Sequence, residues 1–441
     1  MLVRQFLPDC ESETRKHTRD LEVIVKSARF GVVAFVSALL LAGCGDEKKE
    51  EQAAAPATTE QPAAPATTEQ PAAQPAQPAT EGQTASTEQP AAAAEAPAGS
   101  GGELNVYNWS DYIGETTVDD FQKASGVTVR YDVYDSNETL EAKLMAGSTG
   151  YDIVVPTTSF LGRQIQAGLY QEIDKSKLKN YGNIDPQILA AVAPFDPGNK
   201  YAVPYFWGTV GIGYNIDKVK ERLGDNAPVD SLDLLFKPEY ADKLKDCGIS
   251  MLDAPSDMFQ TALKYLGKDP HSKSEEDYAA VEQLFAGIRQ DVKYFHSSQY
   301  INDLANGELC AVIGWSGDVF IAAARADEAQ NNVHLDYRIP KEGSLLWVDS
   351  LAIPKDAKNV DNALKFIDYL NDPQVAANGV NYVSYASPNS AALPMVNAEI
   401  KDNPSIYPNE EVKKNLFPDA VADADLERLR TRTWTKIKTG Q

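Results

Sequence analysis

The sequence predicts an α/β fold with two lobes, each built on a central sheet flanked by helices. Strand and helix patterns alternate from about Glu103 to Gln441, and this alternation is typical of parallel sheets covered by helices on both faces. The glycine-punctuated strand Thr209–Tyr214 is interpreted as the first passage of the chain into a second lobe. Roughly 340 residues of body are enough for two domains with a sizeable core.

Residues 1–43 are predicted to be a targeting segment. The apolar run Phe30–Leu41 follows Lys26 and Arg29, which is the layout of a secretory signal. It ends at Leu-Ala-Gly-Cys44, which closely resembles the bacterial lipoprotein lipobox and implies cleavage before Cys44 and lipidation of its thiol. The alternative is an uncleaved signal anchor. Acidic residues before the basic pair are unusual in a leader, and a start codon assigned too far upstream would explain them.

Residues 44–102 are predicted to be the lipidated cysteine followed by a disordered tether. The segment consists mainly of Ala, Pro, Glu, Gln and Thr, and the unit PATTEQPAA occurs at 56–64 and again at 65–73. Without aromatic or branched aliphatic residues it cannot bury enough surface to fold. The body at 103–441 is therefore expected to be anchored to a membrane by a flexible chain.

Net charge and cysteine content narrow the function classes. The formal net charge of −23 argues against a nucleic-acid-binding protein, which needs a basic face. An acidic body favours the approach of cations, although many proteins are acidic for solubility alone. Cys247 and Cys310 are the cysteines of the body, and in an exported protein they invite a disulfide. No CxxC motif supports a zinc ribbon or a thioredoxin-like site.

The first part of the body is predicted to be a βαβαβ unit. Its strands are expected at Leu104–Val106, Val127–Val133 and Asp152–Val155, and its helices at Thr116–Ala124, Glu138–Met145 and Phe160–Ala167. The strand at 103–106 is expected to end before a loop that holds Trp109 to Tyr112. Because the carboxyl ends of parallel strands meet at one edge, the loops at 109–112, 134–137 and 156–160 should share one rim.

The alternation continues to the end of the chain. Further strands are predicted at Gly248–Leu252, Cys310–Ile313, Leu345–Val348 and Leu351–Pro354, and further helices at Val360–Leu370 and Arg428–Lys438. The first lobe is predicted to span about 103–206 with a returning segment at about 325–378. The second lobe is predicted at about 207–324 together with the C-terminal part.

Aromatic rings and carboxylates recur together at the ends of predicted strands. A single group of this kind favours a packing role, but its recurrence suggests a cleft with aromatic walls and carboxylates at intervals. A linear polyamine matches this pattern, because rings cover its methylenes and attract its ammonium groups, while carboxylates accept hydrogen bonds from those ammonium groups. The groups are Trp109 with Asp111 and Tyr112, Trp315 with Asp318, Trp347 with Asp349, and Tyr385.

Catalytic and metal sites are less well supported. The motif from Gly314 to Asp318 lacks the fifth-position glycine of a nucleophile elbow. His271, His296 and His334 lack metal-ligand spacing, so no metal or cofactor is expected. Paired carboxylates beside aromatic rings also describe glycoside hydrolases, which keeps a secreted hydrolase-like enzyme open as an alternative.

From about Glu103 to Gln441 the chain resembles the periplasmic putrescine-binding proteins of bacterial polyamine ABC importers, within the spermidine/putrescine-binding protein family. The resemblance rests on YNWSDY at 107–112, YDSNETLEAKLMAGSTGYDIVVP at 134–156, FHSSQYINDLANGELC at 295–310, IGWSGD at 313–318 and RTRTWTKIKTG at 430–440. It implies a type II-like periplasmic solute-binding fold whose hinge-linked lobes close on a ligand. It also implies a non-enzymatic monomer whose closed form docks on the membrane subunits of an ABC permease.

The resemblance assigns ligand-binding residues one by one. Thr157, Asp257 and Trp347 stand where the family's putrescine binders are expected to have Ser, Glu and Phe, which makes spermidine a serious candidate beside putrescine. A polyamine-sensing receptor domain is a further alternative. The resemblance also implies the Cys247–Cys310 disulfide. The implied ligand residues are Trp109, Ser110, Asp111, Tyr112, Thr157, Asp257, Ser297, Trp315, Asp318, Trp347, Asp349 and Tyr385.

Overall fold

The computed structural model of the protein describes residues 101–440. The predicted signal, the lipidation site Cys44 and all but the end of the predicted tether lie outside the described residues. Within 101–440, no helix is both long enough and apolar enough to cross a bilayer.

The body opens with the predicted βαβαβ unit. Strand β1 (Glu103–Trp109) lies between β2 (Thr128–Tyr134) and β3 (Ile153–Val154) and pairs with both in parallel. The connecting helices are α2 (Thr117–Ser125) and α3 (Asn137–Ala146), and α4 (Thr158–Gln166) follows β3.

The predicted end of the first strand was wrong. Strand β1 continues to Trp109, which is paired with Tyr134 of β2, so only residues 110–112 of the aromatic stretch lie in the loop. The alternation of apolar residues fades after Val106, but pairing with β2 maintains the extended backbone. The prediction for α3 was confirmed: the Ser136 side chain accepts a hydrogen bond from Thr139 N at 3.2 Å, and Gly147 with φ of 69° ends the helix.

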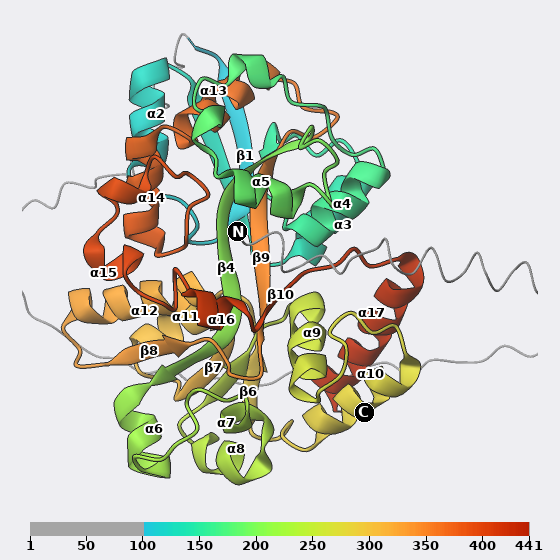
Figure 1. Cartoon of the computed structure of the whole chain (residues 1–441), viewed down its shortest axis with the longest axis vertical. Coiled ribbons are helices and arrows are strands. Elements are labelled where there is room, and N and C mark those ends of the chain that lie inside the picture. The colour runs from blue at the N-terminus through green and yellow to red at the C-terminus, as the bar shows by residue number, and fades with distance from the viewer. Residues whose placement is uncertain (1–100, 441) are drawn as a thin grey trace, which may run out of the picture. The chain divides into compact units, whose positions relative to one another are not determined.

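Two long strands, β4 (Ala202–Asn215) and β9 (Ser344–Ala352), run side by side through the middle of the body (Figure 1). Strand β4 pairs antiparallel with β9 along its first part, and with β7 (Ala311–Trp315) and β8 (Leu335–Arg338) along its last part. Figure 1 shows β4 and β9 side by side between the two groups of helices. One continuous strand β9 replaces the two strands predicted on either side of Asp349, because Asp349 itself pairs with Phe206 of β4.

The strands form two half-sheets that share β4. The first half-sheet contains β2, β1, β3, β9 and the start of β4, and β10 (Leu416–Pro418) pairs with β9. The second half-sheet contains the end of β4 with β7, β8, β5 (Ile249–Met251) and β6 (Val292–Phe295). This arrangement agrees with a two-lobed α/β fold. The predicted boundaries of the lobes stay a prediction.

Helices cover both half-sheets. The predicted helix at Val360–Leu370 was confirmed residue for residue as α13, and the predicted C-terminal helix is longer than expected. The remaining α-helices are α5 (Pro186–Val192), α6 (Ile216–Leu223), α7 (Asp233–Phe236), α8 (Pro238–Leu244), α9 (Pro255–Tyr265), α10 (Glu275–Ala286), α11 (Gln299–Ala305), α12 (Ser316–Ala329), α14 (Pro373–Val383), α15 (Ala398–Lys401), α16 (Glu410–Lys413) and α17 (Ala424–Thr439). Short 3-10 helices lie at η2 (Lys175–Lys177), η3 (Tyr181–Asn183) and η4 (Leu393–Met395).

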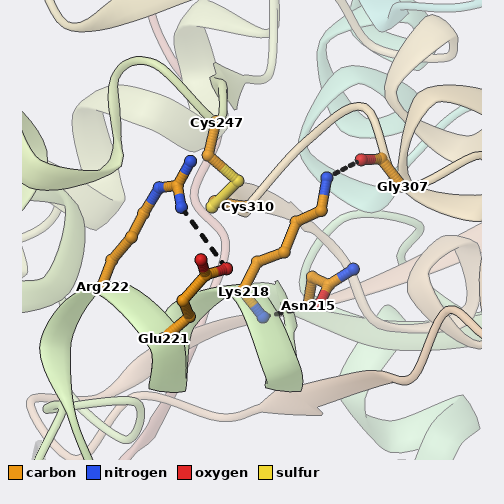
Figure 2. Close-up of a disulfide and its surroundings, with 7 residues drawn as sticks. All are labelled: Asn215, Lys218, Glu221, Arg222, Cys247, Gly307 and Cys310. Atoms are coloured by element: carbon orange, nitrogen blue, oxygen red, sulfur yellow. Dashed lines mark hydrogen bonds and ion pairs between the residues drawn. A yellow bond between two sulfur atoms is a disulfide. The ribbon is translucent and has the colours of Figure 1, made fainter.

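A disulfide joins Cys247 and Cys310, as predicted. The two residues precede the adjacent parallel strands β5 and β7, with their Cα atoms 5.4 Å apart. Figure 2 shows the bond beside Lys218 of α6, which donates a hydrogen bond to the Gly307 carbonyl oxygen. The bridge spans a sequence separation of 63 residues, so it removes substantial entropy from the unfolded chain, worth about 4 kcal/mol at most.

Candidate functional site

A pocket of about 430 Å³, part of it open to solvent, lies between the two half-sheets. The ends of β1, β2 and β3 form one side, and α9, the start of α11 and the β7–α12 junction form the other. The predicted common rim of the loops at 109–112, 134–137 and 156–160 was therefore confirmed. The lining residues are Trp109, Ser110, Tyr112, Tyr134, Asp135, Asn137, Thr157, Asp257, Ser297, Ser298, Trp315, Asp318, Trp347, Asp349 and Tyr385.

The pocket brings together every predicted ligand residue except Asp111. The Asp111 carboxylate forms an ion pair with Arg325 of α12 and does not line the pocket. Four lining residues were not named from the sequence, namely Tyr134, Asp135, Asn137 and Ser298. Three of them belong to the 134–137 loop, whose position on the rim was predicted.

Aromatic rings from both half-sheets meet across the pocket. The Trp109 and Trp315 rings lie 5.4 Å apart between centroids, with an interplanar angle of 76°. The Trp109 indole is fixed by donating Nε1–H to the Val155 carbonyl at 2.8 Å. On another side, Tyr385 contacts Trp347 at 5.4 Å and Tyr112 at 5.0 Å. These faces can cover a methylene chain and attract a cation.

Two buried carboxylates are held by hydroxyl donors. Tyr300 and Tyr385 each donate a hydrogen bond of 2.6 Å to Asp318. Thr157 donates a hydrogen bond of 2.6 Å to Asp349. Asp318 and Asp349 are only 5% and 3% exposed, so bulk water reaches little of either side chain and their hydrogen-bond partners fix their orientation.

Asp257, which is half-buried, also lines the pocket and accepts a hydrogen bond of 2.8 Å from Trp315 Nε1. Asp135 lines the pocket as well and is not included in the group named next. Asp257, Asp318 and Asp349 are called the pocket carboxylates. Burial raises the pKa of each of them to about 7, and none forms an ion pair with another residue in 101–440. A buried carboxylate without a cation is costly, so the pocket is suited to a ligand that carries positive charge.

Three further polar atoms face this pocket without a hydrogen-bond partner in 101–440. They are Tyr112 Oη, Ser297 Oγ and Trp347 Nε1. The two hydroxyl groups can accept hydrogen bonds from an ammonium group, whereas the indole can only donate. Buried polar groups are normally paired, so these atoms mark positions where a bound molecule or water would complete the site.

The described residues hold no apparent metal centre. No group of three or more His, Cys, Asp or Glu residues in 101–440 is arranged to hold a metal ion. His296 Nδ1 accepts hydrogen bonds of 3.1 Å from the Ser298 and Gln299 backbone amides, and His334 pairs with Asp217. Both imidazoles therefore have local structural partners.

The fold and the pocket together define a two-lobed solute-binding protein, in which a small ligand is held between two α/β halves. Residues 116–408 match the family described as bacterial extracellular solute-binding protein. The chain belongs to this family, and within it to the spermidine/putrescine-binding proteins, as the following similarities establish.

The similarity to the relatives extends over most of this chain and most of each relative. The chain is 55% identical to the putrescine-binding periplasmic protein PotF of Escherichia coli (strain K12), over 77% of this chain and 92% of the relative. It is 52% identical to the putrescine-binding periplasmic protein SpuD of Pseudomonas aeruginosa (strain UCBPP-PA14), with the same two coverages. Among solved structures, the spermidine/putrescine ABC transporter substrate-binding protein PotD of Streptococcus pneumoniae is 30% identical with a TM-score of 0.61, over 76% of this chain and 98% of that protein.

Proposed function

We propose that the protein captures a polyamine in the periplasm and delivers it to the permease of an ABC importer. The observation that carries this proposal is the set of pocket carboxylates, which lie among aromatic rings without an ion-pair partner in 101–440; Asp318 and Asp349 are buried and Asp257 is half-buried. The printed names of its relatives, which are putrescine-binding and spermidine/putrescine-binding proteins, support the same ligand class.

Charge neutralisation explains why a polyamine would bind tightly. Each ammonium group placed against a pocket carboxylate replaces an uncompensated buried charge with a charge-assisted hydrogen bond. The Trp109 and Trp315 rings come from different half-sheets and both line the pocket, so a ligand in the pocket contacts both lobes at once. Such contacts are complete only when the lobes are closed, which couples binding to closure.

The preference for putrescine or spermidine depends on the positions where this chain differs from the residues expected in a putrescine-binding protein. Asp257 is one methylene shorter than the expected glutamate, and Trp347 offers a larger ring than phenylalanine. A shorter acid leaves room at one end of the pocket, and an indole covers more of a methylene chain. These differences support spermidine as a ligand beside putrescine.

The names of the relatives and the predicted signal segment support a proposed location and proposed partners for the protein. Periplasmic relatives at 55% and 52% identity support a periplasmic body. The apparent lipobox at Cys44 supports a lipid anchor, with the 44–102 segment as a tether. The proposed partners are the membrane subunits of the permease, which the closed monomer would contact. The relatives' names describe binding proteins, which does not favour the hydrolase-like alternative.

A thermal-shift panel tests the proposal. A ligand that binds only the folded state raises the melting temperature. Putrescine, cadaverine, spermidine and spermine are compared with neutral sugars and amino acids at pH 8. We expect stabilisation by at least one of putrescine and spermidine and none by the neutral compounds. Absence of a shift with every polyamine would refute the proposed ligand class, and product formation from an added oligosaccharide would favour the hydrolase.

A further inference from the structure

A second polar cluster lies outside the ligand pocket, around Arg163 of α4. Its guanidinium donates through Nε and Nη2 to the two oxygens of Glu141, at 2.8 and 2.5 Å. Its remaining nitrogen Nη1 lies 2.8 Å from Glu427 Oε1 of α17. The Arg163 and Glu427 side chains are 19% and 26% exposed, so salt screens this pair less than a surface ion pair.

The pair joins elements that belong to different half-sheets. Helix α4 follows β3 of the first half-sheet, whereas α17 packs on α9 and α10 beside the second. Figure 1 shows α4 among the upper helices and α17 among the lower ones. Asp419, in the segment before α17, also connects the two sides, because it accepts hydrogen bonds from Ser159 of α4 and from Gln260 of α9. A relative movement of the lobes therefore acts on these contacts.

The cluster ends next to a pocket carboxylate. Glu427 Oε1 lies 3.2 Å from Arg430 Nη1, and the same nitrogen donates to Ser256 Oγ at 3.1 Å. Arg430 is 3% exposed, so its position is fixed by these partners. Ser256 immediately precedes Asp257 in the first turn of α9. A continuous series of polar contacts thus runs from Arg163 to Ser256, the residue before the pocket residue Asp257.

We propose that the Arg163–Glu427 pair is a closure clamp, which forms when the lobes close on the ligand and holds α9 so that Asp257 faces it. Arg163 acts as a positioning residue, since it touches no part of the pocket. The inference rests on the proposed function. A contact made only in the closed state adds its free energy to ligand affinity, because binding and closure are linked.

A double-mutant cycle on the full mature chain tests the clamp. The variants are Arg163→Met, Glu427→Gln and the double variant, and spermidine and putrescine are the probes. The Arg163 guanidinium carbon lies over the Phe160 ring, 4.5 Å from its centroid, and the uncharged methionine side chain is long enough to pack on the same ring. We expect each single variant to lower polyamine affinity about tenfold through faster dissociation, and the double variant to bind no more weakly than either.

The control is Arg428→Met, which removes the exposed Arg428–Asp425 pair on the same helix and should leave affinity unchanged. The clamp is refuted if the single variants lower the melting temperature of the unliganded protein but keep wild-type affinity, because the pair then exists in both states. Additive effects of the two variants on affinity would also refute it. Failure of the wild-type protein to bind any polyamine would refute the proposed function itself, and with it the clamp.

Discussion

Polyamine binding should release protons, and its affinity should rise with pH. Burial raises the pKa of each pocket carboxylate to about 7, so at pH 6 all three are mostly protonated in the unliganded protein. An ammonium group favours the ionised carboxylate. Binding at pH 6 must therefore displace a proton from each carboxylate that the ligand contacts, whereas at pH 8 little is displaced.

The magnitude follows from this pKa. For one carboxylate with a pKa of about 7, the ionised fraction falls about tenfold between pH 8 and pH 6. Affinity should therefore fall about tenfold for each carboxylate engaged, which is about a hundredfold for two and a thousandfold for three. Both amino groups of putrescine stay protonated over this range, so the comparison is made with putrescine and the ligand itself does not contribute.

Isothermal titration calorimetry measures the effect directly. Titrations at pH 6 and pH 8, each in two buffers with different ionisation enthalpies, report both affinity and the number of protons released. Asp349→Asn should reduce the number released at pH 6 by about one, which identifies the group responsible. Equal affinities at both pH values, together with no proton exchange at pH 6, would refute the reasoning.

Four further outcomes are expected. The unliganded protein should lose stability as pH rises from about 4 to 7, because the folded state holds protons that the unfolded chain releases; thermal melts at pH 5 and pH 8 check the sign. Asp349→Asn should weaken polyamine binding at pH 8 by about tenfold or more in calorimetry, because one ammonium loses its charged acceptor. Arg325→Ala removes the ion pair to the loop at 110–112 and should speed ligand release in stopped-flow experiments. Replacing Cys247 and Cys310 together by serine should lower the melting temperature but leave affinity unchanged, since the bond lies within the second half-sheet.

The sequence predicted correctly those helices whose ends are determined by residues close together in the chain. The helix at Val360–Leu370 was predicted correctly and the helix at Glu138–Met145 to within one residue at each end, because apolar spacing and capping residues determine them within a few positions. Strand β9 was split in two because Asp349 interrupts its apolar sequence. The backbone of Asp349 nevertheless pairs with Phe206 of β4, and such long-range pairing is not visible in the local sequence.

The candidate site was predictable in composition but not in the direction of every side chain. The rings and acids at 109, 315, 318, 347 and 349 meet because each stands at or near a strand that borders the pocket. Asp111 shares this setting, yet it pairs with Arg325, a residue 214 positions away. The Arg163–Glu427 pair likewise depends on a contact between α4 and α17, which no spacing along the chain indicates.

The central claim is that buried carboxylates select a ligand for its charge. Its most direct test is calorimetric titration of the full chain at pH 8 with putrescine and spermidine, beside the neutral isostere 1,4-butanediol. We predict saturable binding of at least one polyamine with a stoichiometry of about one, as expected for a single pocket between two lobes, and no measurable binding of the diol. Comparable binding of the diol and putrescine, or no binding of either polyamine, would contradict the claim.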